Sequence, residues 1–321
     1  MRAVYAARIA PGDPLSALEI GERPEPERPA EDWVTVDVRA SSLNHHDLWS
    51  LQGVGLSAEQ VPMILGCDAA GVDPDGDEVV VHSVIDRSVA GSPPWSMLSE
   101  YFPGTFAERI AVPSANLVPK PPALSFAQAA CLPTAWLTAY RMLTTKGRLP
   151  EGGSVLVQGA GGGVATAAVV LGVALGARVY ATSRDAAKRE RIAALGATAL
   201  DSGARLPERV DVVVETVGAA TFEHSMKCAK RGGRIVVSGA TSGHLPEVNL
   251  RRVFALELEI LGSSMGTRDE LAALVELCAV RGVRPVVDSE YAFGSDDGVR
   301  EAFGRLAAGD VFGKIVIDHT R

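Results

Sequence analysis

The sequence has no hydrophobic run long enough to cross a membrane as a helix. Such a helix needs about 18 or more apolar residues in succession, and no apolar run of this 321-residue chain reaches that length. The first residues, MRAVYAARIAPGDP, also lack the apolar core of a secretory signal peptide. From these two absences we expect a cytoplasmic protein with no membrane partner.

Cysteine is scarce, and the chain carries no excess of positive charge. Its four cysteines, at positions 67, 131, 228 and 278, are far apart, which in a reducing compartment is typical of free thiols. There are 31 basic and 39 acidic residues, a net charge of -8. Such a chain is not suited to hold a polyanion over a broad surface, so we expect no nucleic-acid partner. A small anionic ligand in a local basic pocket is still allowed.

The first 120 or so residues have the pattern of short strands. Residues 33–40 (WVTVDVRA) alternate between apolar and polar side chains, and residues 77–83 and 105–112 are further strand candidates. The Pro- and Ser-rich segment 88–103 is typical of a long surface loop. The length of the chain favours two domains, and this first part predicts a β-rich one.

From about Ser125 the pattern changes to an alternation of strands and helices. The segments SVLVQGA, ARVYATS, DVVVETV and RIVVSGA are short apolar strands, and VATAAVVLGVALG and AAKRERIAALG are helical stretches between them. This alternation predicts a parallel, doubly wound α/β sheet that is buried on both faces. Helices over 268–280 and 298–308 follow, and the strand 313–318 is expected to return to the first domain.

A glycine-rich turn joins the first apolar strand to the first helix of this part. The literal G-x-G-x-x-G pattern is absent, and the register that fits is 160–165, with alanine at both outer glycine positions. A strand, a turn of small residues and a helix form the order required to hold a pyrophosphate at a helix N-terminus. We therefore predict that Gly161, Gly162, Gly163 and Val164 bind a dinucleotide, the alternative being a turn that serves packing alone.

The end of the second strand indicates which dinucleotide is bound. An NAD site commonly has an acidic residue there, about 20 residues after the turn. This strand ends in Ser183, followed by Arg184 and then Lys188. A hydroxyl and two cations suit a 2′-phosphate, so we predict NADPH as the cofactor. The alternative is that both cations only solvate the start of a helix.

Over nearly its full length the chain resembles the medium-chain dehydrogenase/reductase superfamily. The segments that carry the resemblance are NHHDLWSLQG, PMILGCDAAG, GDEVVVHS, GTFAERIAVPSANLVPKPP, AGGGVA and FGKIVI. The resemblance implies a GroES-like catalytic domain (1–122 and 264–321) and an inserted Rossmann cofactor domain (123–263), with substrate and nicotinamide meeting between them. It also implies a homodimer joined at the edge strand around EILGSSM.

Within the superfamily, this chain departs from the zinc enzymes. Their three catalytic zinc ligands fall on Asn44, Cys67 and a position near Thr134, and no cysteine lies between 67 and 131 for a structural zinc. His45 and His46 are neighbours and are not expected to face one ion together. The N-x-x-D pattern of Asn44 and Asp47 resembles the zinc-free quinone reductases, so we predict no bound metal.

Chemistry without a metal favours substrates whose negative charge is delocalised after hydride addition. A quinone or an α,β-unsaturated carbonyl meets this condition, and hydrogen-bond donors then suffice to stabilise the product. We predict Asn44 as an amide donor, His46 as a proton donor and Asp47 as the third residue of the catalytic set. The alternatives are that Asn44 only shapes a turn, that His46 is a packed neutral histidine and that Asp47 holds the loop.

Further residues are predicted to contact the cofactor from the ends of other strands and from one helix: Thr138, Val217, Gly239, Ala240, Ser242, Ser263 and Ser264. The leading hypothesis is an NADPH-dependent, zinc-free reductase. Two alternatives stay open, namely a zinc alcohol dehydrogenase with atypical ligands and a protein that binds NADPH without turnover.

Overall fold

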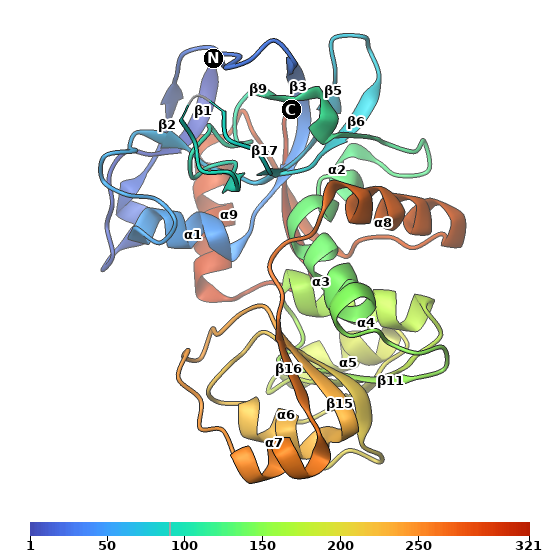
Figure 1. The fold of residues 1–321 in the computed structure, drawn as a ribbon. Coiled ribbons are helices and arrows are strands. Elements are labelled where there is room, and N and C mark those ends of the chain that lie inside the picture. Colours follow the sequence, from blue (N-terminus) through green and yellow to red (C-terminus); the bar gives the residue numbers. More distant parts are fainter. Residues whose placement is uncertain (90) are drawn as a thin grey trace. The chain divides into compact units, whose positions relative to one another are not determined.

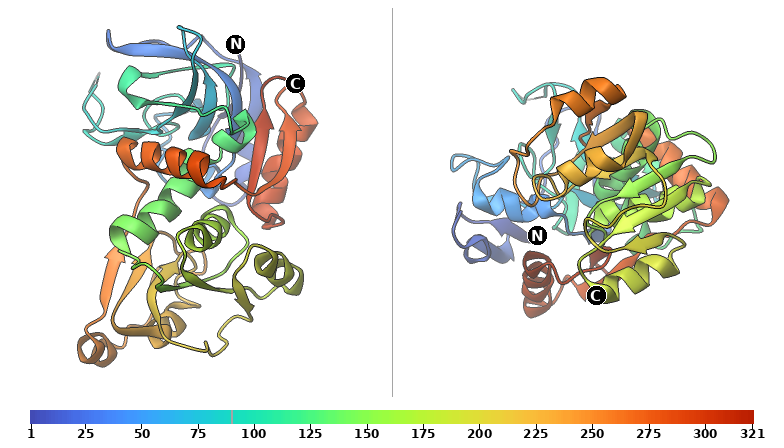
Figure 2. Two further views of the ribbon diagram at one scale, coloured as in Figure 1. Left: turned by 90° about the vertical axis from the view of Figure 1, so that its right-hand side faces the viewer. Right: turned by 90° about the horizontal axis from the view of Figure 1, so that it is seen from below.

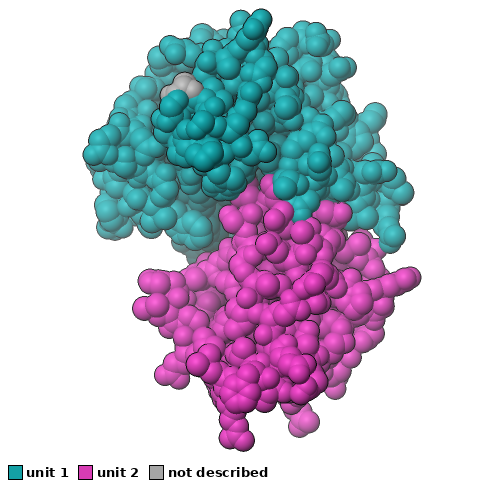
Figure 3. Space-filling view, in the orientation of Figure 1, with its two compact units in different colours: residues 1–134, 267–321 teal, residues 135–266 magenta. Residues whose placement is uncertain are grey.

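The computed structural model describes residues 1–89 and 91–321 and divides the chain into two compact units. Unit 1 contains residues 1–134 and 267–321, and unit 2 contains residues 135–266 (Figure 3). Among the described residues, no helix has both the length and the apolar character needed to span a membrane.

Unit 1 is built mainly from antiparallel strands. Its strands are β1 (Arg2–Ala6), β2 (Leu18–Glu22), β3 (Trp33–Ser42), β4 (Met63–Ile64), β5 (Asp68–Val72), β6 (Glu78–Val81), β7 (Val84–Ile85), β8 (Ser96–Met97), β9 (Arg109–Pro113), β10 (Leu117–Pro119), β17 (Val287–Ala292) and β18 (Lys314–Asp318). Its helices are η1 (Pro14–Ala17), α1 (His45–Gln52), η2 (Ser114–Asn116), α2 (Phe126–Ala129), α8 (Arg268–Arg281) and α9 (Asp296–Ala308).

The largest sheet of unit 1 joins both ends of the chain. Its order is β10-β6-β5-β3-β18-β17, with β9 also paired to β3. The predicted return of the last strand to the first domain is confirmed, because β18 pairs antiparallel with β3 (Val316 opposite Ser42). Helices α1 and α9 come from distant parts of the sequence and lie next to each other (Figure 1). Both contribute to one apolar core, which includes Leu51 and Phe303.

The strand predictions for this unit hold with small shifts at the boundaries. The predicted strands 33–40 and 77–83 correspond to β3 and β6, whereas the third starts at Arg109 rather than at 105. The predicted loop 88–103 contains the two-residue strand β8, which pairs with β7, and position 90 lies outside the described residues.

Unit 2 contains a six-stranded parallel sheet in the order β13-β12-β11-β14-β15-β16. Its strands are β11 (Ser154–Val157), β12 (Arg178–Thr182), β13 (Thr198–Leu200), β14 (Val210–Glu215), β15 (Ala229–Val237) and β16 (Glu259–Gly262). Its helices are α3 (Leu137–Arg141), η4 (Met142–Lys146), α4 (Gly163–Ala174), α5 (Ala186–Ala194), α6 (Phe222–Cys228) and α7 (Leu250–Leu256), and η3 (Leu132–Trp136) spans the boundary between the units.

This sheet confirms the prediction of a doubly wound α/β fold. The central strands β11 and β14 are buried along nearly their whole length, as expected for a sheet covered on both faces. Helices α4 and α5 lie on one side and α6 and α7 on the other (Figures 1 and 2). The strand order reverses between β11 and β14, and in open parallel sheets ligands bind at the carboxyl ends of the strands next to such a point.

The first boundary lies later in the chain than predicted. Unit 1 extends to residue 134 rather than 122 because α2 packs against strands β3, β5, β17 and β18 of that unit. The second boundary lies after residue 266 rather than 263.

Candidate functional site

The motif NHHD forms the first turn of helix α1 in unit 1. Asn44 is the N-cap residue, and its backbone N–H donates a hydrogen bond to the Oδ2 atom of Asp47 at 2.7 Å. This contact satisfies one of the N–H groups that a helix start leaves unpaired. Asp47 is fully buried, and its second oxygen, Oδ1, has no hydrogen-bond partner. Asp47 therefore holds the loop through Oδ2, while its other oxygen is buried without a hydrogen-bond partner.

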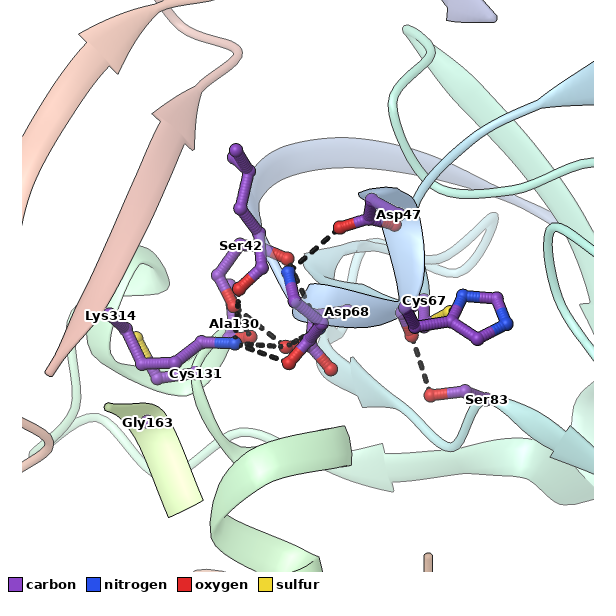
Figure 4. A network of polar contacts seen from close by, with 12 residues as sticks. Ser42, Asp47, Cys67, Asp68, Ser83, Ala130, Cys131, Gly163 and Lys314 are labelled. Atoms are coloured by element: carbon purple, nitrogen blue, oxygen red, sulfur yellow. Dashed lines mark hydrogen bonds and ion pairs between the residues drawn. The ribbon is translucent and has the colours of Figure 1, made fainter. Parts of the chain in front are cut away.

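The carboxamide of Asn44 is already engaged on both sides, by Asp68 and by Lys314, which are labelled in Figure 4. Its Nδ2 donates to Asp68 Oδ2 at 2.8 Å, and its Oδ1 accepts from Lys314 Nζ at 2.7 Å. One amide hydrogen faces only a long contact of 3.4 Å to the Ser42 carbonyl. Asn44 can turn no more than this weakly held hydrogen toward a substrate.

Lys314 and Asp68 form a buried ion pair at the centre of this network. Their side chains are 2% and 0% exposed, and Lys314 Nζ lies 3.0 Å from Asp68 Oδ2 and 2.6 Å from the Leu43 carbonyl. Ser42 Oγ also donates to Asp68. An ammonium taken out of water is stable only when it is paired and hydrogen-bonded in this way. Sequence reasoning missed both residues, and the signal was a lysine at the start of an otherwise apolar strand, in GKIVI.

His46 lies in a chain of polar contacts that includes a thiol. Its Nε2 is 2.9 Å from Glu100 Oε1, and its Nδ1 is 3.3 Å from Cys67 Sγ. Burial alone lowers the pKa of His46, but Cys67, Glu100 and Asp47 outweigh this effect and raise it to about 11. Cys67 contributes most to this rise, followed by Glu100 and Asp47, and His46 in turn lowers the pKa of Cys67, which burial raises. These partners favour the protonated form of His46 over a packed neutral histidine.

His46, Asp47 and Cys67 also bring three possible metal ligands together. One nitrogen, one oxygen and one sulfur atom from these side chains lie within 4.8 Å of one another. His45 is not part of the group, as expected for a neighbouring residue on the helix, and burial and the charge of Lys314 lower its pKa. This donor set fits a divalent cation such as zinc in number and type.

The glycine-rich turn after β11 has the backbone required for a close approach. Gly159 and Gly161 adopt φ angles of +63° and +147°, which favour glycine. Gly162 is the N-cap of the 12-residue helix α4, and a β-carbon added there would meet no atom within 4 Å. The predicted residues Gly161–Val164 thus form an open helix N-terminus at the carboxyl end of β11, the place where a phosphate is favoured.

The first turn of α5, which follows β12, brings one of the predicted cations, Lys188, to the glycine-rich turn. The side chain of Lys188 lies across Gly161, since a β-carbon on that glycine would be 2.9 Å from Lys188 Cδ and 3.5 Å from its Nζ. Ser183 is buried and Arg184 is exposed. Asp185, which follows Arg184 in the sequence, caps α5 by accepting from the Lys188 backbone N–H. Sequence reasoning missed Arg189, which donates to the Ser183 carbonyl at 2.8 Å.

The other predicted cofactor residues occupy the ends of the neighbouring strands. Ser242 N and Oγ both donate to the Val217 carbonyl at 2.7 Å, which ties the turn after β14 to the turn after β15. Gly239 and Ala240 lie in the turn after β15, which ends at Val237. Ser263, which follows β16, donates from its backbone N–H to the Val237 carbonyl. Ser263 Oγ is buried without a partner, and Ser264 is exposed. Thr138 differs from the rest because it lies buried on helix α3.

Comparisons with known proteins match both parts of the chain. Residues 30–122 match the alcohol dehydrogenase GroES-like domain, and residues 163–280 match the zinc-binding dehydrogenase domain. A solved NAD-dependent alcohol dehydrogenase is 34% identical, with 99% of both chains covered and a TM-score of 0.87. The chain belongs to the medium-chain dehydrogenase/reductase superfamily. It is accordingly an oxidoreductase with a GroES-like and a Rossmann domain.

Two other members of the superfamily carry names that point to reduction of activated alkenes. The acryloyl-coenzyme A reductase of Sulfurisphaera tokodaii is 26% identical over 97% of this chain and 99% of its own. The 2-octenoyl-CoA carboxylase reductase CinF, solved with NADP and 2-octenoyl-CoA, is 25% identical. The match covers 99% of this chain and 87% of CinF, with a TM-score of 0.88.

The zinc that the superfamily implies does not fit its usual ligand positions in this chain. Asn44 offers no free donor atom, since its oxygen is bound to the ammonium of Lys314, and Thr134 has only a buried, unpartnered hydroxyl. The residues that fit a cation are instead His46, Asp47 and Cys67.

Proposed function

We propose that this protein is an NADPH-dependent reductase that transfers hydride to an α,β-unsaturated carbonyl compound or a quinone without catalytic zinc. The observation that carries the proposal is the charge at the end of β12, where Lys188 reaches the glycine-rich turn, while Asp185 caps a helix and Asp201 bonds to Arg189. A 2′-phosphate would find a cation there, and both of these carboxylates already have partners. CinF, a relative bound to NADP, supports the same cofactor.

The proposed reaction adds hydride from the nicotinamide to the β-carbon of the substrate. The electron pair of the C=C bond moves toward the carbonyl and forms an enolate, which then takes one proton at the α-carbon. His46 is the proposed proton donor because its partners Cys67 and Glu100, together with Asp47, raise its pKa to about 11. Glu100, whose side chain is 24% exposed, connects His46 to solvent for reprotonation.

The roles of Asn44 and Asp47 follow from their contacts. Asn44 is proposed to present its weakly bonded amide hydrogen to the carbonyl oxygen, while Lys314 and Asp68 fix its orientation. Asp47 contributes by anchoring the N-terminus of α1 and by its charge beside His46. The cofactor residues proposed in unit 2 are those at the carboxyl ends of β11, β12, β14, β15 and β16, together with Thr138.

One observation favours a second candidate, a metal-dependent alcohol dehydrogenase. The atoms of His46, Asp47 and Cys67 form a possible three-ligand set, and a zinc ion held by three protein ligands acts as a Lewis acid on a carbonyl oxygen. In that case His46 would be a ligand and not a proton donor, so the two proposals assign it different roles.

A panel of substrates separates these proposals. Enoyl thioesters, simple enones, quinones and unactivated ketones would each be offered with NADPH and with NADH, and oxidation followed at the nicotinamide absorbance band. We expect turnover of activated alkenes or quinones with NADPH and with no added metal. Turnover of ketones alone, abolished by a chelator, would support the metal-dependent dehydrogenase. NADPH binding without turnover of any compound would support the non-catalytic alternative.

Assembly and location are part of the same proposal. Strand β16 lies at the edge of its sheet, and exposed apolar side chains lie on it and on α7 before it: Leu250, Phe254 and Ile260. Edge strands of this kind invite pairing, which supports a homodimer through β16. All four cysteines are buried free thiols, which supports a reducing compartment such as the cytoplasm.

A further inference from the structure

A chain of buried side chains runs across the carboxyl ends of three neighbouring strands in unit 2. It consists of Thr182 on β12, Gln158 after β11, Ser225 on α6 and Glu215 on β14. These residues are 1%, 0%, 0% and 0% exposed. None of the four is among the predicted site residues, and three of them, Thr182, Gln158 and Glu215, stand within two residues of a position assigned above to the cofactor or to the glycine-rich turn.

The hydrogen bonds of this chain all point the same way. Thr182 Oγ1 donates to Gln158 Oε1 at 2.7 Å, Gln158 Nε2 donates to Ser225 Oγ at 3.0 Å, and Ser225 Oγ donates to Glu215 Oε2 at 2.5 Å. A run of donors ending on a carboxylate polarises each bond and strengthens it. His224 fixes the orientation of the Gln158 amide, because its Nδ1 accepts from Nε2 at 2.8 Å. Its own Nε2 faces the Ala204 carbonyl, so that nitrogen carries the hydrogen.

Both ends of the chain hold backbone N–H groups of cofactor turns. At one end, Gly159 N donates to Thr182 Oγ1 at 3.3 Å. At the other, Glu215 Oε1 accepts from Val217 N at 2.8 Å and from Gly218 N at 3.0 Å. The two turns also touch, since a β-carbon on Gly159 would lie 2.4 Å from Val217 Cγ2. The chain therefore closes a ring that fixes the turn after β11 against the turn after β14.

We propose that Thr182, Gln158, Ser225 and Glu215 act together as positioning residues that set the separation of these two turns and thereby the affinity for the nicotinamide cofactor. The proposal rests on the proposed function, because it takes these turns to be the cofactor site. The two turns flank the point where the strand order reverses, so a change in their spacing alters the place where a dinucleotide lies. Thr182 also precedes Ser183, which extends the effect to the 2′-phosphate end.

A double-mutant cycle on Thr182→Val and Ser225→Ala tests the proposal. Each replacement removes one hydroxyl with little change of volume, and each hydroxyl bonds to Gln158. The dissociation constants of NADPH and NADH would be measured by titration of nicotinamide fluorescence, with the unfolding of each cofactor-free variant as a second readout. We expect each single variant to bind NADPH about fivefold more weakly and the double variant to lose little more than either.

Ser154→Ala is the matched control. Ser154 is 1% exposed and its hydroxyl bonds to the partly buried Asp211, but it lies at the opposite, amino end of β11. We expect Ser154→Ala to lower stability by an amount comparable to that of Thr182→Val while both dissociation constants stay within about twofold of wild type. A merely structural role of the chain would make Thr182→Val behave like this control.

The outcomes separate this proposal from the proposed function. The positioning proposal alone would be overturned if wild type binds NADPH and the variants bind it equally well. It would also be overturned if the fold-losses of the two single variants multiply in the double variant. Wild type that prefers NADH would overturn the cofactor assignment, and the cycle would then be read with NADH. Wild type that binds neither cofactor would overturn both. Thr182→Val carries the test by itself if Ser225→Ala fails to fold.

Discussion

Replacing Lys314 by methionine removes the ammonium of the buried ion pair while keeping the length of the side chain. The carboxylate of Asp68 is fully buried, and its Oδ1 atom already lacks a hydrogen-bond partner. Without the ammonium, its Oδ2 atom would keep only the hydrogen bonds from Ser42 and Asn44. Breaking a buried pair by removing one partner costs about 3–5 kcal/mol. Because two donors to Asp68 remain, we expect the lower end, about 3 kcal/mol.

Unfolding in urea, followed by tryptophan fluorescence, measures this loss of stability in unit 1. Trp33, Trp49 and Trp95 belong to unit 1, as do Lys314 and Asp68. With a denaturant dependence of about 2 kcal/mol per molar urea, the expected loss moves the midpoint down by about 1.5 M. Adding Asp68→Asn removes the stranded charge, so the double variant is expected to be more stable than Lys314→Met alone.

Arg87→Met serves as the control in the same unit, since the ion pair of Arg87 with Asp32 lies on the surface and exposed pairs of this kind contribute less than about 1 kcal/mol. A Lys314→Met midpoint within about 0.3 M of wild type would refute the view that the buried pair supports this network. So would a double variant that is no more stable than Lys314→Met.

Four further predictions concern cofactor choice, pH, metal and assembly. Arg184→Ala is expected to weaken NADPH binding by about one to two orders of magnitude with little effect on NADH, and Ser183→Asp to shift the preference further toward NADH; equal weakening of both cofactors by Arg184→Ala would contradict the assignment. Burial lowers the pKa of His319 to about 3, so the unfolded chain binds the additional proton below about pH 6.5 and stability falls as the pH drops toward 3. The expected loss between pH 7 and pH 5 is about 2 kcal/mol at most, and it should shrink in His319→Gln if this residue is the cause. Elemental analysis of protein purified without chelator or histidine tag is expected to find no zinc, and about one zinc per chain, lost in Cys67→Ser, would favour the metal-dependent alternative. Sedimentation at micromolar concentration is expected to show a dimer that Ile260→Lys converts to a monomer, and a monomeric wild type would exclude pairing through β16.

The fold could be predicted because its signals are local. The alternation of 33–40 and the apolar strands of unit 2 each report which side chains are buried, and this follows from neighbouring residues in the sequence. The glycine-rich turn was found for the same reason, since a strand, a turn and a helix follow one another directly. The boundaries between the two units could not be predicted to the residue, because the extent of unit 1 depends on which strands α2 packs against.

The polar partners in the candidate site could not be predicted, because they are brought together by tertiary structure. Lys314 lies 246 residues from Asp68 and reaches it only because β18 pairs with β3. Glu100 comes from the segment predicted as a surface loop, and nothing in its local pattern indicates a contact with His46. Sequence reasoning can identify a histidine as a candidate, but the groups that set its charge state are fixed by the fold.

The position of β18 has a consequence for the order in which the chain folds during synthesis. Unit 2 is one continuous segment, so all of its residues have been made before the ribosome reaches β18. Until then, residues 40–42 of β3 lack the partner that β18 will supply, although β9 already pairs with residues 33–37, and the backbone groups of 40–42 are open to pairing with another chain. A chaperone that shields strand edges would therefore matter most during the interval between completion of unit 2 and release of the finished chain.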